Sequence, residues 1–226
     1  MTELLDSIVT FFTTVIEYFP KFIPGVIWTL ELAFFSILFG TVLGLIVAML
    51  KLTNKKFITV FMDLYVTIIR GTPLLLQLYF IFYGLPGMGI IIASFPSAVI
   101  GLTLHNGAYI SEIFRGAIES IDFGQREAAR SLGMSRFQAM KRVILPQAFK
   151  RSIPALGNQF IIAIKDSSLA SVITITEIML LAKQYASVTY DVFPIFFIAG
   201  VYYLAIILVV TKVLRRIELK LKISER

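Results

Sequence analysis

Residues 192–211 read VFPIFFIAGVYYLAIILVVT and contain no charged side chain. A helix needs about 20 such residues to cross the roughly 30 Å hydrocarbon core of a bilayer, so this stretch predicts a transmembrane helix. The whole chain has the same character: of its 226 residues, 58% are hydrophobic and 15% are charged, and the mean hydropathy is +0.85. This composition predicts an all-α integral membrane protein and argues against a disordered chain, a collagen-like fibre and a water-soluble enzyme.

Four further apolar stretches precede this one, so that the chain is expected to contain five transmembrane helices. They cover residues 23–50, 57–85, 94–117 and 153–181. The second stretch contains the helix breaker Gly71-Thr72-Pro73, and such breaks are tolerated at membrane depth where they line a cavity or are buried against protein. Nearer the N-terminus, residues 4–19 are apolar but interrupted by two acids. They predict a short interfacial helix on the outer membrane surface.

The positive charge of the chain is unevenly placed. The formal net charge is +7, and most Lys and Arg residues fall in three segments, 51–56, 126–151 and 212–226. These segments alternate with the apolar stretches as the positive-inside rule expects of cytoplasmic loops, so we expect the N-terminus outside and the C-terminus in the cytoplasm. The same placement argues against a nucleic-acid partner. With no cysteine and only His105, the chain lacks the usual ligands of a metal centre, and no metal site is predicted.

One polar segment, residues 120–146, does not fit a membrane span. Its apolar residues follow the three-and-four spacing of an amphipathic helix. The stretches Asp122–Gln125 and Ser135–Gln138 resemble capping boxes, each of which would open a helix. Gly133 suits the left-handed residue that ends the first helix, and Pro146 is expected to bound the second. The segment therefore predicts a helix-turn-helix on the cytoplasmic face, with a solvated loop as the alternative.

This polar segment resembles the EAA motif of bacterial ABC importer permeases. The resemblance rests on Glu127-Ala128-Ala129, on Gly133 and on Val143-Ile144-Leu145-Pro146, with Val143 where the family has isoleucine. The chain is also similar to the polar amino acid permeases in five stretches: residues 70–75 (RGTPLL), 108–116 (AYISEIFRG), 124–129 (GQREAA), 145–148 (LPQA) and 165–169 (KDSSL). The likeness runs from about Gly25 to the C-terminus.

The resemblance implies a type I importer in the bacterial cytoplasmic membrane. Its permease would be a single transmembrane domain over residues 1–226, with a cytoplasmic coupling loop at about 120–150. Two permease subunits, identical or homologous, would form the path, two ABC ATPase subunits would bind beneath, and an extracytoplasmic substrate-binding protein would dock outside. The residues implied in ATPase coupling are Glu127, Ala128, Ala129, Gly133, Leu145 and Pro146.

The chain itself lacks a phosphate-binding loop. It contains no Gly-Lys dipeptide, so it has no Walker A motif. ATP and Mg²⁺ are therefore expected on the partner ATPase subunit. This chain is expected to be no enzyme and to bind no cofactor of its own.

Polar side chains within the apolar stretches are costly in a bilayer and are candidates for substrate contact. Asp166 is the first candidate, for the cationic end of an amino acid. Asn106, Ser167, Ser168 and Glu112 follow, because they offer hydrogen-bond donors and acceptors or a second acid. Asn106 can instead join two helices. The implied substrate is a polar amino acid, with arginine, lysine or histidine favoured and glutamine as the rival.

The two acids among these candidates also have structural alternatives. Asp166 can neutralise Arg70 or Arg115 across the bundle. Glu112 can pair with the neighbouring charges on its own helix, Arg115 and Glu119, because these residues follow it by three and seven positions.

Two other classes of function remain as alternatives, a membrane-embedded enzyme and a secondary transporter. An enzyme would need a nucleophile or a metal site, and one histidine without any cysteine leaves little to build it from. A secondary transporter would be expected to show an inverted repeat, whereas this sequence has a large docking loop and no detectable repeat.

Overall fold

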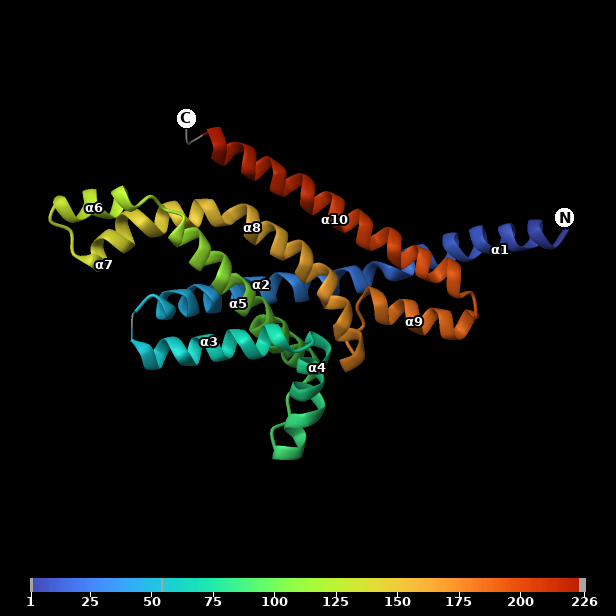
Figure 1. Cartoon of the computed structure of the whole chain (residues 1–226). Coiled ribbons are helices and arrows are strands. Elements are labelled where there is room, and N and C mark those ends of the chain that lie inside the picture. The colour runs from blue at the N-terminus through green and yellow to red at the C-terminus, as the bar shows by residue number, and fades with distance from the viewer. Residues whose placement is uncertain (1, 54, 224–226) are drawn as a thin grey trace.

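The structure, a computed structural model, describes residues 2–53 and 55–223, with side chains for residues 5–53 and 55–220. Within these residues it consists of helices and the turns between them, as the predicted all-α class requires. The helices are α1 (Thr2–Tyr18), α2 (Ile23–Lys51), α3 (Lys56–Gly71), α4 (Leu74–Tyr79), α5 (Ser94–Glu119), α6 (Phe123–Ser131), α7 (Arg136–Ala139), α8 (Leu145–Asp166), α9 (Ile178–Thr189) and α10 (Val192–Ile223). In Figure 1, α6 and α7 lie at one end of the bundle and α1 and α9 at the other.

The contact of α2 with α5 is the most extensive helix pair in the described part of the chain. Glycines on α2 make this contact close. A Cβ atom on Gly44 would lie 2.7 Å from Cγ2 of Ile110 and 2.9 Å from the backbone nitrogen of Ser111, and one on Gly40 would lie 3.0 Å from Cβ of Asn106. Helices in lipid gain little from the hydrophobic effect, so close packing of small residues holds them together instead.

The N-terminal helix predicted for residues 4–19 is present as α1, but it is not a separate element. The 3-10 turn Phe19–Phe22 joins it to α2, so that Leu5–Lys51 form one run of 47 residues. At about 1.5 Å per residue this run is about 70 Å long, more than twice the roughly 30 Å hydrocarbon core. A large part of the run must therefore lie outside that core. α1 packs on the start of α10, where the ring of Phe11 contacts that of Phe193.

The span predicted for residues 57–85 is a bent pair of helical segments. The chain runs as α3 to Gly71 and then continues through α4 and two short turns to Met88, and the two halves are bent by 105°. Pro73 causes the break, because proline disfavours helical geometry in the residue before it. Thr72 accordingly has an extended conformation with φ −119° and ψ 147°. The breaker predicted at Gly71-Thr72-Pro73 is therefore confirmed.

The span predicted for residues 153–181 differs from the structure at both ends. Helix α8 begins earlier, inside the polar segment, and ends at Asp166, where the 3-10 segment Ser167–Ile173 follows. Thr174 then takes a left-handed conformation with φ 67°, and Glu177 caps the separate helix α9. The polar run Lys165–Ser168 lies at this break, but averaged over the whole stretch the hydropathy stays high enough to suggest one helix.

The helix-turn-helix predicted for residues 120–146 is present as α6 and α7. The Asp122 carboxylate caps α6 by accepting a backbone N–H, although it does not form the complete box that its sequence resembles. Ser135 and Gln138 do form a complete capping box at the start of α7. Gly133 has φ 80°, the left-handed geometry expected where the first helix ends. The alternative of an unstructured solvated loop is thereby excluded.

Pro146 does not bound the second helix as predicted. A π-helical turn, Met140–Ile144, carries α7 directly into α8, and Pro146 lies in the first turn of α8. The Leu145 N–H bonds to the carbonyl oxygen of Met140, five residues back. Proline is tolerated in a first helical turn, where its missing N–H is of little consequence. The chain from Arg136 to Asp166 is therefore one helical rod.

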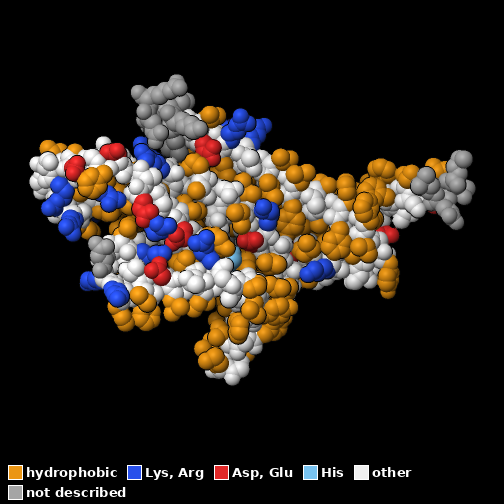
Figure 2. Space-filling model, viewed as in Figure 1, with side chains coloured by type: hydrophobic (Ala, Val, Ile, Leu, Met, Phe, Trp, Pro, Cys, Tyr) orange, Lys and Arg blue, Asp and Glu red, His pale blue; other side chains and the backbone are white. Residues whose placement is uncertain are grey.

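The helices predicted for residues 23–50, 94–117 and 192–211 are confirmed as parts of α2, α5 and α10. Among the described residues, two runs are long and apolar enough to cross a membrane, Leu5–Lys51 and Val192–Lys220, and the bent α3 pair is a third if it counts as one span. Figure 2 shows hydrophobic side chains over much of the visible face, with Lys and Arg gathered toward the α6–α7 end. We call this the basic end.

We expect Gly44→Ala to destabilise the protein, because the new methyl group would overlap Ile110 and the backbone of Ser111. Overpacking of this kind costs about 1–3 kcal/mol. Gly200→Ala on α10 is the control, since it gains the same helix propensity and its Cβ would meet nothing within 4 Å. The unfolding midpoints of the two purified variants are measured in mixed detergent micelles. Equal midpoints would contradict the close contact of α2 with α5.

Candidate functional site

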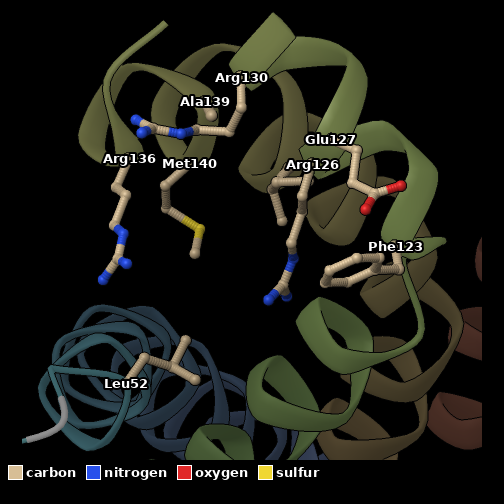
Figure 3. A pocket seen from close by; sticks show the side chains of 9 residues that line it. Leu52, Phe123, Arg126, Glu127, Arg130, Arg136, Ala139 and Met140 are labelled. Carbon is tan, nitrogen blue, oxygen red and sulfur yellow. The ribbon is translucent and has the colours of Figure 1, made fainter.

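The basic end contains a groove of about 520 Å³ beneath α6 and α7. Its floor is Leu52, the residue that follows α2, and its walls come from α6, α7 and the π-helical turn. Figure 3 shows the side chains of Arg126, Arg136 and Met140 pointing into the space above Leu52. The groove is therefore apolar at its base and lined with guanidinium groups.

Large apolar side chains on this polar surface are unusually exposed. Leu132 and Phe137 are 79% and 71% exposed, and Phe123 at the edge of the groove is 68% exposed. Inside the groove, the Nε of Arg126 is buried and has no hydrogen-bond partner among the described residues. Exposed apolar groups beside unpaired cations are typical of a surface that binds another protein.

The residues predicted to couple to a partner do not share one surface. Glu127 lines the groove, and Ala128 beside it is also exposed. Ala129 is only 3% exposed, so it packs within the helix-turn-helix rather than facing a partner. Gly133 is exposed at the turn.

The two remaining coupling candidates, Leu145 and Pro146, lie away from this groove. They line a separate apolar hollow of about 230 Å³ together with Phe114 and Phe149. Leu145 also packs against a buried cluster that contains Ile144. The EAA-like stretch therefore reaches two neighbouring surfaces at the basic end.

A network of ion pairs ties the end of α2 to the middle of α3 and to the last third of α5. Lys51 Nζ lies 2.8 Å from carboxylate oxygens of both Asp63 and Glu112. Arg115 in turn lies 2.8 Å from Glu112 and 2.7 Å from Glu119. Both oxygens of Glu112 are thus occupied, and the alternative that it pairs with its neighbours is confirmed. The contribution of Lys51 was missed in the sequence, because its partners are far away along the chain.

Asn106 is completely buried between α5 and α8. Its amide nitrogen donates to the carbonyl oxygen of Leu102, and its oxygen accepts a hydrogen bond of 2.8 Å from Nε2 of Gln159 on α8. Gln159 was not singled out in the sequence, although a glutamine in an apolar stretch is itself a signal for such a contact. The structure thus places Asn106 where it joins two helices, and its role toward a substrate stays a prediction.

Asp166 is the last residue of α8 and is half-buried. Among the described residues it has no ion pair, so the structure does not show the predicted alternative in which it neutralises Arg70 or Arg115. Ser167 and Ser168 follow it, and their hydroxyls donate to the carbonyl oxygens of Ile164 and Lys165. Asp166 therefore ends α8 with a carboxylate that forms no ion pair among the described residues.

The neighbouring acid Glu177 has a structural role. It is completely buried, and its oxygens accept 2.8 Å hydrogen bonds from the N–H groups of Met179 and Leu180 at the start of α9. The hydroxyl of Tyr203 on α10 donates a third hydrogen bond to it. A negative charge is favoured at a helix N-terminus, which is the signal that could have identified this role.

The chain matches the family described as the binding-protein-dependent transport system inner membrane component over residues 40–223. It is 42% identical to the nopaline transport system permease protein NocM of Agrobacterium fabrum, over 90% of this chain and 89% of the relative. It is 36% identical to the arginine transport system permease protein ArtQ of Bacillus subtilis, over 95% of this chain and 98% of the relative. The L-cystine transport system permease protein TcyB of Bacillus subtilis is 40% identical, over 82% and 80%.

Solved structures agree with these relatives. A chain in the crystal structure of an amino acid ABC transporter with histidines aligns with a TM-score of 0.87 and 41% identity, over 92% of this chain and 98% of that chain. The inward-facing MetNI methionine ABC transporter aligns with a TM-score of 0.75 over 88% and 95%, and at 23% identity it supports the fold alone.

We expect the hydrogen bond between Asn106 and Gln159 to stabilise the contact of α5 with α8. Asn106→Leu or Gln159→Leu alone leaves a buried amide without its partner and costs about 1–3 kcal/mol. The double variant removes both amides and should cost less than the sum of the two. Detergent unfolding of the four proteins gives the coupling energy, which is expected to be about 1 kcal/mol. Strict additivity would show that the pair is not formed.

Proposed function

We propose that this chain carries basic amino acids, with arginine and lysine first. The chain belongs to the family of binding-protein-dependent transport system inner membrane components. It is the permease subunit of an amino acid ABC transporter and a multi-pass protein of the inner membrane. It is not itself an enzyme, since the ATPase of these transporters is a separate subunit. Family membership also sets aside the secondary transporter and the membrane-embedded enzyme.

The unpaired carboxylate of Asp166 carries the proposal of a basic substrate. A half-buried acid at the end of α8, without an ion pair among the described residues, needs a cation from elsewhere. The side chain of arginine, lysine or histidine would supply that cation. An arginine permease among the similar proteins agrees with this substrate class. A cystine permease and a putative glutamine permease are also among them, and glutamine remains the alternative. Of the other predicted contacts, Ser168 is half-exposed next to Asp166 and is the next candidate.

We place the remaining candidates further from the substrate. Ser167 and Asn106 are buried and already hydrogen-bonded within the chain. Glu112 is held by two cations near the basic end. In this proposal Asn106 and Ser167 hold the helices that line the path, and Glu112 lies at the cytoplasmic end of the path.

The groove at the basic end is the proposed docking site of the ATPase subunit. Its apolar floor, its guanidinium groups and the exposed Phe123, Leu132 and Phe137 suit an insertion of apolar side chains with acidic groups at the rim. Glu127, Ala128 and Gly133 are the candidate contacts on its surface. Ala129 would act from within by keeping α6 packed, while Leu145 and Pro146 would form a second contact at the start of α8.

The rest of the assembly follows from the same orientation. The basic end faces the cytoplasm, so that the N-terminus lies outside and the described part of α10 ends inside, as the placement of Lys and Arg favours. ATP and Mg²⁺ would bind to the ATPase subunit. A substrate-binding protein would dock on the opposite end of the bundle, and a second permease, identical or homologous, would complete the path.

Reconstitution with the partner ATPase and binding protein tests the substrate class. We expect ATP-dependent uptake of arginine that excess lysine inhibits more strongly than glutamine. Asp166→Asn should lower arginine uptake about tenfold or more, because a charged contact is lost while size and assembly are kept. Asp63→Asn is the matched control, since Asp63 lies in the ion network at the basic end. Preferential uptake of glutamine, or unchanged arginine uptake by Asp166→Asn, would contradict the basic substrate.

The turn between α6 and α7 tests the docking site. Gly133→Val forces a β-branched residue to φ 80° and should distort the turn, whereas Gly133→Asn tolerates this geometry and is the control. We expect the valine variant to lower both uptake and transport-coupled ATP hydrolysis about tenfold, with the membrane bundle as stable as before. If Gly133→Val retains fully coupled hydrolysis, the docking assignment is wrong.

A further inference from the structure

Two opposite charges, Arg70 and Asp166, lie on different helices without an ion pair among the described residues. Arg70 is exposed near the end of α3, and Asp166 is half-buried at the end of α8. Neither forms an ion pair with any side chain that the structure describes. At about 1.5 Å per residue, Arg70 lies about 21 Å along α3 from Lys56, and Asp166 about 22 Å along α8 from Arg151. Along its helix, each of the two charges therefore lies less than one core thickness, about 30 Å, from that basic residue.

Arg70 is held in place by its surroundings. Its guanidinium carbon lies 5.0 Å from the ring centroid of Tyr109 on α5, within the range of a cation–π contact. The rings of His105 and Tyr109 also pack together, with their centroids 5.0 Å apart. Nδ1 of His105 is buried and has no partner among the described residues. Arg70 is thus oriented by an aromatic face rather than neutralised by an acid.

The helix break beside Arg70 is also fixed. Nε2 of Gln77 donates to the carbonyl oxygens of Ile69 and Thr72, the residues on either side of the Arg70-Gly71 pair, at 2.8 and 3.1 Å. A single side chain therefore satisfies the backbone that Pro73 has opened. Such irregular backbone persists at membrane depth where it lines a cavity or is buried against protein.

The segments that carry the two charges meet in one apolar cluster. Leu74 and Leu78 of α4, directly after the break, pack in a buried core with Ala170 and Ile173 of the 3-10 segment that follows Asp166. α4 and this 3-10 segment are in direct contact. Arg70 precedes Leu74 and Asp166 precedes Ala170 by four residues each, so the contact between these segments links the two parts of the chain that carry the charges.

We propose that Arg70 binds the α-carboxylate of the transported amino acid, opposite an Asp166 that faces its cationic side chain. This inference rests on the proposed function and adds a second recognition group to it. An unpaired arginine inside a bilayer is costly, so it is expected to face the path or a partner rather than lipid. Its planar guanidinium matches a carboxylate with two parallel hydrogen bonds, which gives both affinity and orientation. The substrate class becomes free α-amino acids, with decarboxylated amines excluded.

Lys165 is the competing cation, since it is exposed next to Asp166. Its ammonium group is a point charge on a flexible stem, and no aromatic or polar contact orients it among the described residues. Adjacent helical residues also point about 100° apart, so Lys165 and Asp166 do not easily contact the same group of a ligand. The test therefore treats Lys165→Gln as the matched control for Arg70→Gln.

The experiment compares binding of arginine and of agmatine, which is arginine without its carboxylate. The complex of this chain with its ATPase partner is assembled in nanodiscs, and binding of each radiolabelled probe is measured without the binding protein. We expect the unsubstituted complex to bind arginine at least about tenfold more tightly than agmatine. Arg70→Gln should weaken arginine to the level of agmatine and leave agmatine unchanged, whereas Lys165→Gln should keep the ratio. Asp166→Asn should weaken both probes.

Several results would overturn the inference. They are equal affinity of the unsubstituted complex for the two probes, an unchanged ratio in Arg70→Gln, or a ratio that is lost in Lys165→Gln instead. If Arg70→Gln does not assemble, Arg70→Lys is measured instead. It keeps the positive charge but lacks the planar guanidinium, so it should reduce the ratio of arginine affinity to agmatine affinity. An unchanged ratio there also counts against Arg70.

A failure of the proposed function is separable from these results. If the uptake assay selects glutamine, the basic substrate is wrong, and the carboxylate is then tested with glutamine and 4-aminobutanamide in the same four complexes. The effect of Arg70→Gln on the affinities for glutamine and 4-aminobutanamide then tests the carboxylate contact independently of the substrate side chain.

Discussion

The close contact of α2 with α5 is the constraint on which the other features depend. Gly40 and Gly44 remove the side chains that would hold the two backbones apart, so α5 lies directly on α2. This contact sets Glu112 within 2.8 Å of Lys51, and it places Leu52 at the floor of the groove. The same helix α5 presents Asn106 to α8 and Tyr109 to α3. One backbone contact thus fixes the relative positions of the groove, the ion network and the polar groups at depth.

The two interruptions of the bundle share a physical logic. A regular helix in lipid satisfies its own backbone, so an interruption persists only where something else does so. At the α3–α4 break, the Gln77 amide supplies the hydrogen bonds, and after α8 the carbonyls take hydrogen bonds from Ser167 and Ser168. Each interruption lies beside an unpaired charge. The protein therefore uses irregular backbone where it also has polar groups to offer.

Much of this arrangement could be predicted from the sequence, because hydropathy, charge placement and capping are local signals. The uninterrupted apolar stretches gave α2, α5 and α10, and Ser135, Gln138 and Gly133 gave the helix-turn-helix. Errors arose where local signals are ambiguous. Pro146 reads as a terminator in isolation, although the π-helical turn before it lets the helix continue. The polar run Lys165–Ser168 lies where α8 ends, but it was interpreted as a candidate site and not as a helix end. The partners of Lys51 and Asn106 are distant in the chain and could only be found from the fold.

The unbroken rod from Arg136 to Asp166 has a mechanical consequence. Its thirty-one residues measure about 45 Å, and one end forms part of the groove while the other carries the free carboxylate. A helix resists stretching, so a tilt imposed on α7 must either reach Asp166 as a rigid swing or be absorbed along the way. The rod departs from regular α-helical hydrogen bonding in two regions, the π-helical turn Met140–Ile144 with the following Pro146, and Pro154. The stiffness of the helix in these two regions therefore sets how far a displacement of α7 moves Asp166.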